Sequence, residues 1–271
     1  MRLSLAGAQG KLPVVIRDGY IGLTLGNTPS THIIKPEPEH YPGLVAIEGL
    51  CMRLARDLGL NVPGVSSRQI GPTTCLIVAR YDRVIADDGT ATRIHQEDLC
   101  QALGIHPARK YQQDGGPLVR DCIEMLRDWS TDPLNDVTAF VDALIFNASI
   151  GNADAHGKNY SMLYDQAERR LAPLYDLVCT RAWPELSKTP AMKIGGARSV
   201  DAITPEHWEA MANESELAWP RLEERIAELT DQLAEAIDTP DLRREADEDA
   251  ALARAVEVIE QRSRKVGGRG R

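Results

Sequence analysis

The sequence contains no run of about 18 apolar residues, the length that a membrane-spanning helix requires. Its opening segment, residues 1–8, turns polar too soon to supply the apolar core of a secretory signal peptide. We therefore expect neither a membrane span nor secretion, and we place the protein in the cytoplasm. Its 271 residues, 43% hydrophobic and 26% charged, suit a globular protein with one large domain or two lobes.

Cysteine and histidine are too few and too scattered for the sites that they commonly build. The five cysteines form no C-x-x-C pair, and an odd, scattered set is typical of free thiols in a reducing compartment. The six histidines form no cluster with the spacing of metal ligands. These absences argue against a disulfide framework and against a zinc site.

Positive charge is also in short supply. The chain has 31 lysines and arginines against 40 acidic residues, which gives a formal net charge of −9. Affinity for nucleic acid comes largely from basic side chains that neutralise phosphates. A broad nucleic-acid-binding face is therefore not expected, and any contact with DNA would pass through a partner protein.

What is present is a polar segment, G-N-A-D-A-H-G-K-N-Y at residues 151–160, which follows an apolar helical pattern. Asp154 and Asn159 have the spacing of the base and the metal ligand in the catalytic loop of protein kinases. The match rests on these two residues and Lys158, because Asn152 stands where that loop has histidine. A plain solvated loop is the alternative, since Gly, Asn and Asp are ordinary loop residues.

A glycine-rich segment and a lysine-bearing strand near the start suit the same chemistry, and a predicted hairpin lies between them. Residues 4–11, S-L-A-G-A-Q-G-K, could bring backbone N–H groups to phosphate oxygens, although they match neither standard phosphate-loop motif and a plain turn is the alternative. Residues 12–24 contain an Asp-Gly pair between two β-prone runs and predict a hairpin. Residues 31–36 predict a further strand, which carries Lys35.

A helix is predicted over residues 41–58 from its apolar period, and Glu48 lies close to the apolar stripe. In two-lobed kinases a helix glutamate orients the strand lysine toward phosphate, and Glu48 is our candidate for that role. Glu37 and Glu39 are alternatives, as is a merely solvated Glu48. A buried strand is predicted over residues 73–80.

Helices dominate the rest of the chain, apart from one hairpin. Asp176 follows that hairpin and is the expected second metal-binding carboxylate, with a capping aspartate as the alternative. The predicted helices cover residues 96–103, 118–129, 133–150 and most of the chain from 205, including a charged helix over 243–264; the hairpin has strands at 160–164 and 171–174 joined by a turn at 165–170.

This order of elements predicts an α+β fold with two lobes, like that of protein kinases. We expect a small β-rich N-lobe over residues 1–84 and a larger helical C-lobe over 85–265. A nucleotide base could bind at the connection near residues 81–88. The basic segment from residue 262 is expected to be solvated, ending in a flexible tail over 266–271.

Together these motifs resemble the HipA-like serine/threonine protein kinases, which are toxins of bacterial toxin–antitoxin systems. The resemblance spans nearly the whole chain and rests on the loop at residues 151–160, on the start, and on the runs T-H-I-I-K-P, E-G-L-C-M-R-L-A, A-R-Y-D-R, H-Q-E-D-L-C-Q-A-L-G and L-A-P-L-Y-D-L. It implies an enzyme that uses ATP and Mg²⁺ to phosphorylate a protein hydroxyl.

The resemblance also implies roles for individual residues. Asp154 corresponds to the catalytic base, Asn159 and Asp176 to the Mg²⁺ ligands, and Ser4 to the serine whose autophosphorylation switches the kinase off. At Ala79 the family often has glutamate. The implied ATP-binding residues are Ala6, Gly7, Ala8, Gln9, Gly10, Lys11, Lys35, Ala79, Arg80, Tyr81, His156, Gly157, Lys158, Asn159, Tyr175 and Asp176.

One departure from the family pattern stands out. Family members carry roughly a further hundred residues, the size of a small domain, before the glycine-rich loop. This chain starts almost at that loop and looks like the short form, in which the small domain is absent or made as a separate neutralising polypeptide. A truncated gene is the other possibility.

Three functions are compatible with these features. The first is a kinase toxin whose targets, as in the family, are aminoacyl-tRNA synthetases, and whose partners are an antitoxin and, only through it, DNA. The second is a pseudokinase that binds an antitoxin or a target without catalysis. The third, the least favoured, is a small-molecule phosphotransferase with a similar site.

Overall fold

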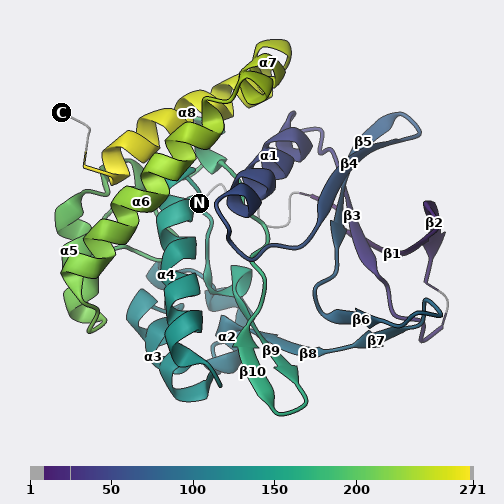
Figure 1. Ribbon diagram of the computed structural model, residues 1–271, viewed down its shortest axis with the longest axis horizontal. Coiled ribbons are helices and arrows are strands. Elements are labelled where there is room, and N and C mark those ends of the chain that lie inside the picture. Colours follow the sequence, from purple (N-terminus) through teal and green to yellow (C-terminus); the bar gives the residue numbers. More distant parts are fainter. Residues whose placement is uncertain (1–8, 25, 269–271) are drawn as a thin grey trace.

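An antiparallel sheet forms the first part of the molecule. In the computed structural model, which describes residues 9–24 and 26–268, its strands lie in the order β2-β1-β3-β5-β4 (Figure 1). Their bounds are Leu12–Arg17 for β1, Tyr20–Leu23 for β2, His32–Pro36 for β3, Val65–Ile70 for β4 and Thr73–Ala79 for β5. The Asp-Gly hairpin is confirmed, because Arg17 pairs with Tyr20 across a two-residue turn. β4 was not predicted, because its residues are mostly polar and exposed and show no apolar pattern.

Helix α1, Leu44–Asp57, packs against β4 and β5 and begins later than the predicted residue 41. Gly43, with a φ of 86°, precedes the helix. The carboxylate of Glu37 accepts hydrogen bonds from the N–H groups of Gly43 and of Val45, the latter at 2.8 Å. Glu37 therefore caps the first turn of α1 rather than serving as a partner for Lys35.

The connection after β5 holds a buried ion cluster. Asp82 is 5% exposed, and its Oδ2 lies 2.6 Å from Arg80 Nη2 and 2.7 Å from Arg83 Nη1. Arg83 also donates to the carbonyl oxygen of Ser30, which ties the connection to the loop before β3. Burial alone would raise the pKa of Asp82, but the two guanidinium groups hold it below its ordinary value.

Three short strands follow, β6 at Arg83–Ile85, β7 at Ala91–Arg93 and β8 at His95–Asp98. The predicted helix over residues 96–103 is therefore wrong in its first half, because β8 pairs with β9 (Ser161–Asp165) of the helical lobe. Helix α2 covers only Leu99–Ala102. A reciprocal capping box between Asp98 and Gln101 sets its start, and the sequence pattern could not show which side of Asp98 was helical.

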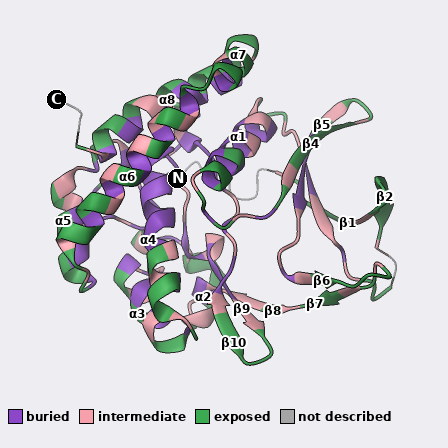
Figure 2. Cartoon of the chain, in the orientation of Figure 1, coloured by how far each residue is buried: buried purple, intermediate pink, exposed green. Residues whose placement is uncertain are grey.

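The larger lobe is built around helix α4, which is buried along most of its length (Figure 2). It contacts α3, α6 and α8, and one extended cluster of buried apolar side chains joins these helices to α1. The helix bounds are Val119–Trp129 for α3, Pro133–Ser149 for α4, Pro205–Glu214 for α5, Trp219–Ile237 for α6, Pro240–Glu248 for α7 and Ala250–Val266 for α8. The predicted proline breaks at Pro220 and Pro240 fall in the first turns of α6 and α7.

The hairpin of this lobe differs from the prediction in its turn. Strands β9, Ser161–Asp165, and β10, Glu168–Leu171, are joined by a two-residue turn in which Gln166 has a φ of 53°. The predicted turn over residues 165–170 was too long, and the return strand ends at Leu171 rather than beginning there. Apolar period alone missed β10 because most of it is polar and exposed.

Two expectations for the C-terminal part are wrong. The charged helix predicted over 243–264 is two helices, because Asp249 has a φ of −128° and its carboxylate accepts from the N–H groups of Ala251 and Leu252 to start α8. The segment from residue 262 is not a solvated tail throughout. Arg262 is 5% exposed and donates to the carbonyl of Ala148 at 3.0 Å, at the end of α4. Residues 269–271 lie outside the described residues.

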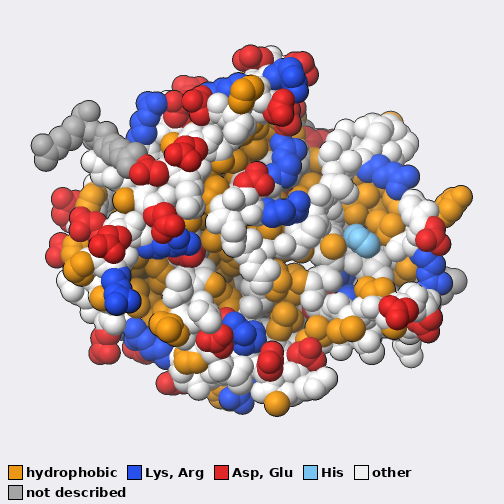
Figure 3. Space-filling view, in the orientation of Figure 1, with side chains coloured by type: hydrophobic (Ala, Val, Ile, Leu, Met, Phe, Trp, Pro, Cys, Tyr) orange, Lys and Arg blue, Asp and Glu red, His pale blue; other side chains and the backbone are white. Residues whose placement is uncertain are grey.

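Within the described ranges, none of the helices combines the length and the apolar character that crossing a membrane would need. On the face shown in Figure 3, basic side chains stand among acidic ones instead of forming one continuous patch. The two-lobed α+β fold is as predicted, while the bounds assigned to each lobe stay a prediction.

The capping role of Asp249 makes a stability prediction. Replacing Asp249 with Ala removes the acceptor for the first N–H groups of α8, so we expect a loss of about 0.5–2 kcal/mol in the free energy of unfolding. Urea denaturation measures this loss. Asp247→Ala, at an exposed position of α7, is the matched control. Equal stability of the two variants would contradict the assigned cap.

The ion cluster at Asp82 predicts a pH dependence. The folded-state pKa is depressed, so the contribution of Asp82 is complete above the ordinary Asp pKa of about 4 and is lost as pH falls below it. Asp82→Asn should therefore cost about 1.5–3 kcal/mol near pH 7, and this difference from the parent should shrink below pH 4. Denaturation at both pH values measures it, with the exposed Asp87→Asn as control. A pH-independent difference would exclude charge pairing as the cause.

Candidate active site

Most of the candidate site residues that the structure describes line one cavity of about 290 Å³ between the two lobes. The N-lobe sheet and α1 supply one wall, and the loop at residues 151–160 and the segment around Asp176 supply the other. The lining residues are Gln9, Lys11, Lys35, Leu44, Glu48, Lys110, Asn152, Asp154, His156, Lys158, Asn159, Tyr175, Asp176, Val178 and Thr180.

A buried lysine joins the two walls. The Lys35 side chain, on β3, is 6% exposed, and its Nζ lies 2.5 Å from Glu48 Oε1 of α1 and also contacts Asp176 Oδ1. Lys11 Nζ lies 3.2 Å from the other carboxylate oxygen of Asp176. The predicted contact between Lys35 and Glu48 is present, so the alternative prediction that Glu48 is exposed to solvent is wrong.

The charges of this cluster depend on one another. Burial alone would lower the pKa of Lys35, but the carboxylates of Asp176 and Glu48 raise it above its ordinary value. Burial likewise opposes charge on Asp176, yet the two lysines hold its pKa well below the usual range. Burial raises the pKa of Glu48, and Lys35 opposes that rise. Lys35 and Asp176 are therefore ionised at neutral pH.

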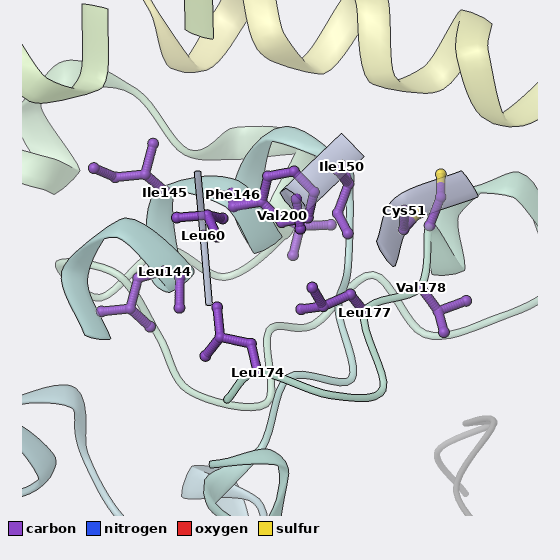
Figure 4. Packing of buried hydrophobic residues seen from close by; sticks show 14 of the residues in the cluster. Cys51, Leu60, Leu144, Ile145, Phe146, Ile150, Leu174, Leu177, Val178 and Val200 are labelled. Carbon is purple, nitrogen blue, oxygen red and sulfur yellow. The ribbon is translucent and has the colours of Figure 1, made fainter. Parts of the chain in front are cut away.

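Asp176 is presented to the cavity by a strained backbone and an apolar anchor. Its φ is 55°, a left-handed conformation that aspartate tolerates better than most residues. On either side, Leu174, Leu177 and Val178 are buried in the core of the larger lobe (Figure 4). The side chains that pack this segment thus force the intervening carboxylate outward.

A network of buried side-chain amides holds the loop that carries Asp154. The Asp154 N–H donates to Asn152 Oδ1 at 3.0 Å, and Asn152 Nδ2 donates to Asn147 Oδ1 at 2.8 Å. Asn147 in turn donates to the hydroxyl of Tyr160. Asn152 Nδ2 also lies 3.5 Å from the carbonyl oxygen of Asp176, which connects the two acidic segments. The sequence singled out Asn152 only as a departure from the kinase pattern.

Thr180 is a second residue that sequence reasoning missed. Its hydroxyl accepts a hydrogen bond from the Ala153 N–H at 2.9 Å and donates to the Gly151 carbonyl at 3.0 Å. One side chain therefore closes the turn that leads into Asp154. Thr180 lies 26 positions after Asp154 in a stretch without a motif, so no sequence signal marked it.

Asn159 and His156 complete the cavity wall. The His156 N–H donates to Asn159 Oδ1 at 3.3 Å within the short turn Gly157–Asn159. Burial, aided by the charge of Lys110, lowers the pKa of His156 to about 3, so its ring is neutral at physiological pH. A Cβ at Gly157 would lie 2.5 Å from Pro117 Cγ, which explains glycine there.

The other predicted ATP-binding residues are placed less directly. The backbone N–H groups of Ala79 and Arg80 donate to carbonyl oxygens of Gly64 and Thr31, so they are already used within the N-lobe. Tyr81 stacks on Tyr175 with ring centroids 5.6 Å apart, and through it adjoins the cavity.

Of the predicted phosphate loop near the start, the structure describes only residues 9–11. Gln9 and Lys11 line the cavity, whereas Gly10 is exposed and does not. Gln9 Nε2 donates to the carbonyl oxygen of Pro36 at 3.0 Å, beside Lys35. Ser4, Ala6, Gly7 and Ala8 lie outside the described residues.

The chemistry of the donors suits a metal ion and an anion. Mg²⁺ prefers oxygen ligands, and the carboxylate of Asp176 and the side-chain oxygen of Asn159 line the same cavity. Lys11, Lys35, Lys110 and Lys158 also line it and offer positive charge to phosphate groups. The residues present therefore fit a magnesium-bound phosphate chain.

Comparison with protein families and relatives agrees with this geometry. A model of the HipA-like C-terminal domain matches residues 3–238. The Y4mE protein of Sinorhizobium fredii, named as a candidate kinase, is 46% identical over 247 residues, covering 89% of this chain and 59% of that protein. The serine/threonine-protein kinase toxin HipA of Shewanella oneidensis is 37% identical over 205 residues, covering 71% of this chain and 47% of that one.

Solved structures give the same relationship. HipA of Shewanella oneidensis, in a complex with HipB and operator DNA, matches with a TM-score of 0.88 at 27% identity, over 99% of this chain and 67% of that one. The proinflammatory kinase CtkA of Helicobacter pylori matches with a TM-score of 0.53 at 12% identity, over 92% and 88% of the two chains, and shows a likeness of fold alone.

The chain thus spans about half the length of the curated relatives it matches, or somewhat more. The family match nevertheless runs through the N-lobe strands, the loop at residues 151–160 and the helices of the larger lobe as far as the end of α6. This chain belongs to the family of HipA-like C-terminal domains.

Proposed function

We propose that this chain is an ATP- and Mg²⁺-dependent serine/threonine protein kinase that acts as the toxin of a toxin–antitoxin system in the cytoplasm. The observation that carries the proposal is the single cavity in which Lys35, Glu48, Asp176, Asp154 and Asn159 meet from both lobes. Phosphoryl transfer needs positioning and charge neutralisation more than covalent chemistry, and this set supplies both.

Each residue has a task in this proposal. Asp176 and Asn159 hold Mg²⁺, which when bound neutralises charge on the phosphate oxygens. Lys35, kept charged and oriented by Glu48, contacts the phosphates, and Lys11 adds a second cation on the other side of Asp176. Asp154 orients the acceptor hydroxyl and takes its proton.

The remaining predicted residues bind the rest of the nucleotide. His156, neutral and buried, Lys158 and Tyr175 line the wall beside the phosphates. Adenine lies by the connection at residues 79–81, where Tyr81 stacks on Tyr175. Because the N–H groups of Ala79 and Arg80 bind other carbonyls, we infer that neither donates to the base.

The acceptor and the partners follow from the family. We propose an aminoacyl-tRNA synthetase as the phosphorylated protein, so that loss of charged tRNA stalls translation, and Ser4 as the site of autophosphorylation. The relative of known structure forms a complex with HipB and operator DNA, which supports a cognate antitoxin as a partner here. With a net charge of −9, contact with DNA through the antitoxin is favoured over direct contact.

A pseudokinase that only binds an antitoxin or a target is the second candidate. Its support is the pair of contacts that Lys11 and Lys35 make with Asp176, because a carboxylate engaged by two lysines must exchange partners before it can hold a metal ion. The presence of every proposed catalytic side chain in one cavity favours the kinase.

The kinase proposal is tested with Asp154→Asn. We expect the parent, incubated with Mg²⁺ and ATP, to gain a phosphate on Ser4 and to phosphorylate one member of a panel of aminoacyl-tRNA synthetases. The variant should bind nucleotide with unchanged affinity and transfer no phosphate, because the proton acceptor is lost. Intact-mass and phosphopeptide analysis measure transfer, and growth arrest on expression in bacteria reports toxicity.

Asp165→Asn, an exposed change at the end of β9, is the matched control and should behave as the parent. Transfer by Asp154→Asn would contradict the role of Asp154. Nucleotide binding by the parent without transfer to itself or to any synthetase would favour the pseudokinase.

A second prediction concerns the partner of Lys35. Glu48→Gln replaces the buried carboxyl group that contacts the Lys35 ammonium group with an amide, so Lys35 forms an ion pair with Asp176 alone and is less well placed for phosphate. We expect the transfer rate to fall by about tenfold to a hundredfold. The control is Glu245→Gln, which breaks a surface ion pair with Arg53 and should leave the rate unchanged. Parent-like transfer by Glu48→Gln would show that the contact is structural only.

A further inference from the structure

Tyr111 contacts the proposed base and belongs to none of the sequence motifs. Its hydroxyl donates to Asp154 Oδ1 at 2.9 Å. Tyr111 is 9% exposed, and its ring meets the His156 ring edge-on, with centroids 5.4 Å apart and planes at 70°. Lys110 Nζ lies 5.0 Å from the centroid of the Tyr111 ring. The tyrosine is thus fixed both at its ring and at its hydroxyl.

Backbone hydrogen bonds and glycine-dependent geometry fix the conformation of the turn that carries Tyr111. The N–H groups of Asp114 and Gly116 both donate to the Tyr111 carbonyl oxygen at 2.9 Å, and Gly115 adopts a φ of 87°. A Cβ at Gly116 would lie 2.4 Å from the Arg109 carbonyl oxygen, so only glycine allows this close approach. The polar run at residues 110–116 is therefore an ordered turn that aims one side chain.

A second connection ties this turn to the same loop. The Gln112 N–H donates to the Ala191 carbonyl at 2.9 Å, and Gln112 Oε1 accepts from the Lys193 N–H at 2.7 Å. The Ala191 N–H donates to the carbonyl of Ala153, the neighbour of Asp154, at 2.9 Å. Tyr111 and Asp154 are thus linked directly and also through the segment at residues 191–193.

From this geometry we propose that Tyr111 is a positioning residue for Asp154, an inference that rests on the proposed kinase function. A donor on Oδ1 fixes the rotation of the carboxylate about its Cβ–Cγ bond, and so sets the direction in which the group meets an acceptor hydroxyl. The amide network of Asn152 fixes the backbone of Asp154, while Tyr111 fixes its side chain. Small displacements of a reacting group lower rates steeply, so this contact is worth a measurable factor in turnover.

The test is Tyr111→Phe, which removes one oxygen and keeps the packed ring. The rate of phosphate incorporation is measured at saturating Mg²⁺ and ATP, for the chain itself and for the synthetase panel, alongside the dissociation constant of ATP and the urea unfolding curve. Tyr164→Phe is the matched control, because the Tyr164 hydroxyl also donates to a carboxylate, Glu97 at 2.7 Å, outside the cavity.

We expect Tyr111→Phe to lower the saturated rate by about tenfold or more while the dissociation constant of ATP changes by less than about twofold. Tyr164→Phe should keep the parent rate. This split separates positioning of the base from a general loss of structure, which would weaken nucleotide binding and stability together.

Four outcomes overturn the inference. A parent-like rate for Tyr111→Phe, or a loss that follows ATP affinity or unfolding, would show a structural role and leave the kinase proposal intact. A faster rate would show that the hydroxyl competes with the acceptor. A parent that binds ATP but transfers no phosphate would overturn the kinase proposal, and the inference with it.

Discussion

The buried ion cluster of Lys35, Glu48 and Asp176 is the interaction on which the arrangement of the molecule depends. A lysine in an almost fully buried position is costly unless carboxylates surround it, and here they come from α1 and from the segment after β10. The cluster therefore joins the sheet, its helix and the larger lobe at one point. The cavity lies at that point because the buried opposite charges stabilise one another only at short distance.

The rest of the site is arranged around this cluster by polar contacts at the ends of apolar elements. Helix α4 is buried along most of its length, and the polar loop begins where that helix ends. Asn152 accepts from the backbone N–H of Asp154 and is itself held by the side chain of Asn147, and Thr180 closes the turn that leads into Asp154. Such contacts stabilise one loop conformation in a place where water cannot supply alternative partners. The larger lobe thus supports the chemistry through its polar side chains as much as through its packing.

Much of this was predictable because local patterns carried it. The Asp-Gly hairpin, the strand with Lys35, helix α1 and helix α4 follow from turn residues and apolar period, and the spacing of Asp154 and Asn159 marked the loop. The failures share one cause. Strands β4 and β10 and the division between α7 and α8 depend on pairing or capping, and neither leaves an apolar period in the sequence. Arg262 looked solvated because charge usually means exposure, yet it ends against the carbonyl of Ala148.

By itself the sequence determined the two-lobed class, the elements with a clear apolar period and the family, since apolar period and motif spacing are properties of neighbouring residues. Only the tertiary structure decided that Glu48 rather than Glu37 meets Lys35, that Asn152 and Thr180 hold the loop of Asp154, and that Tyr111 reaches its carboxylate. These contacts join residues far apart in the chain. Their partners are selected by the packing of whole elements, and no local pattern encodes which of several polar side chains that packing will bring together.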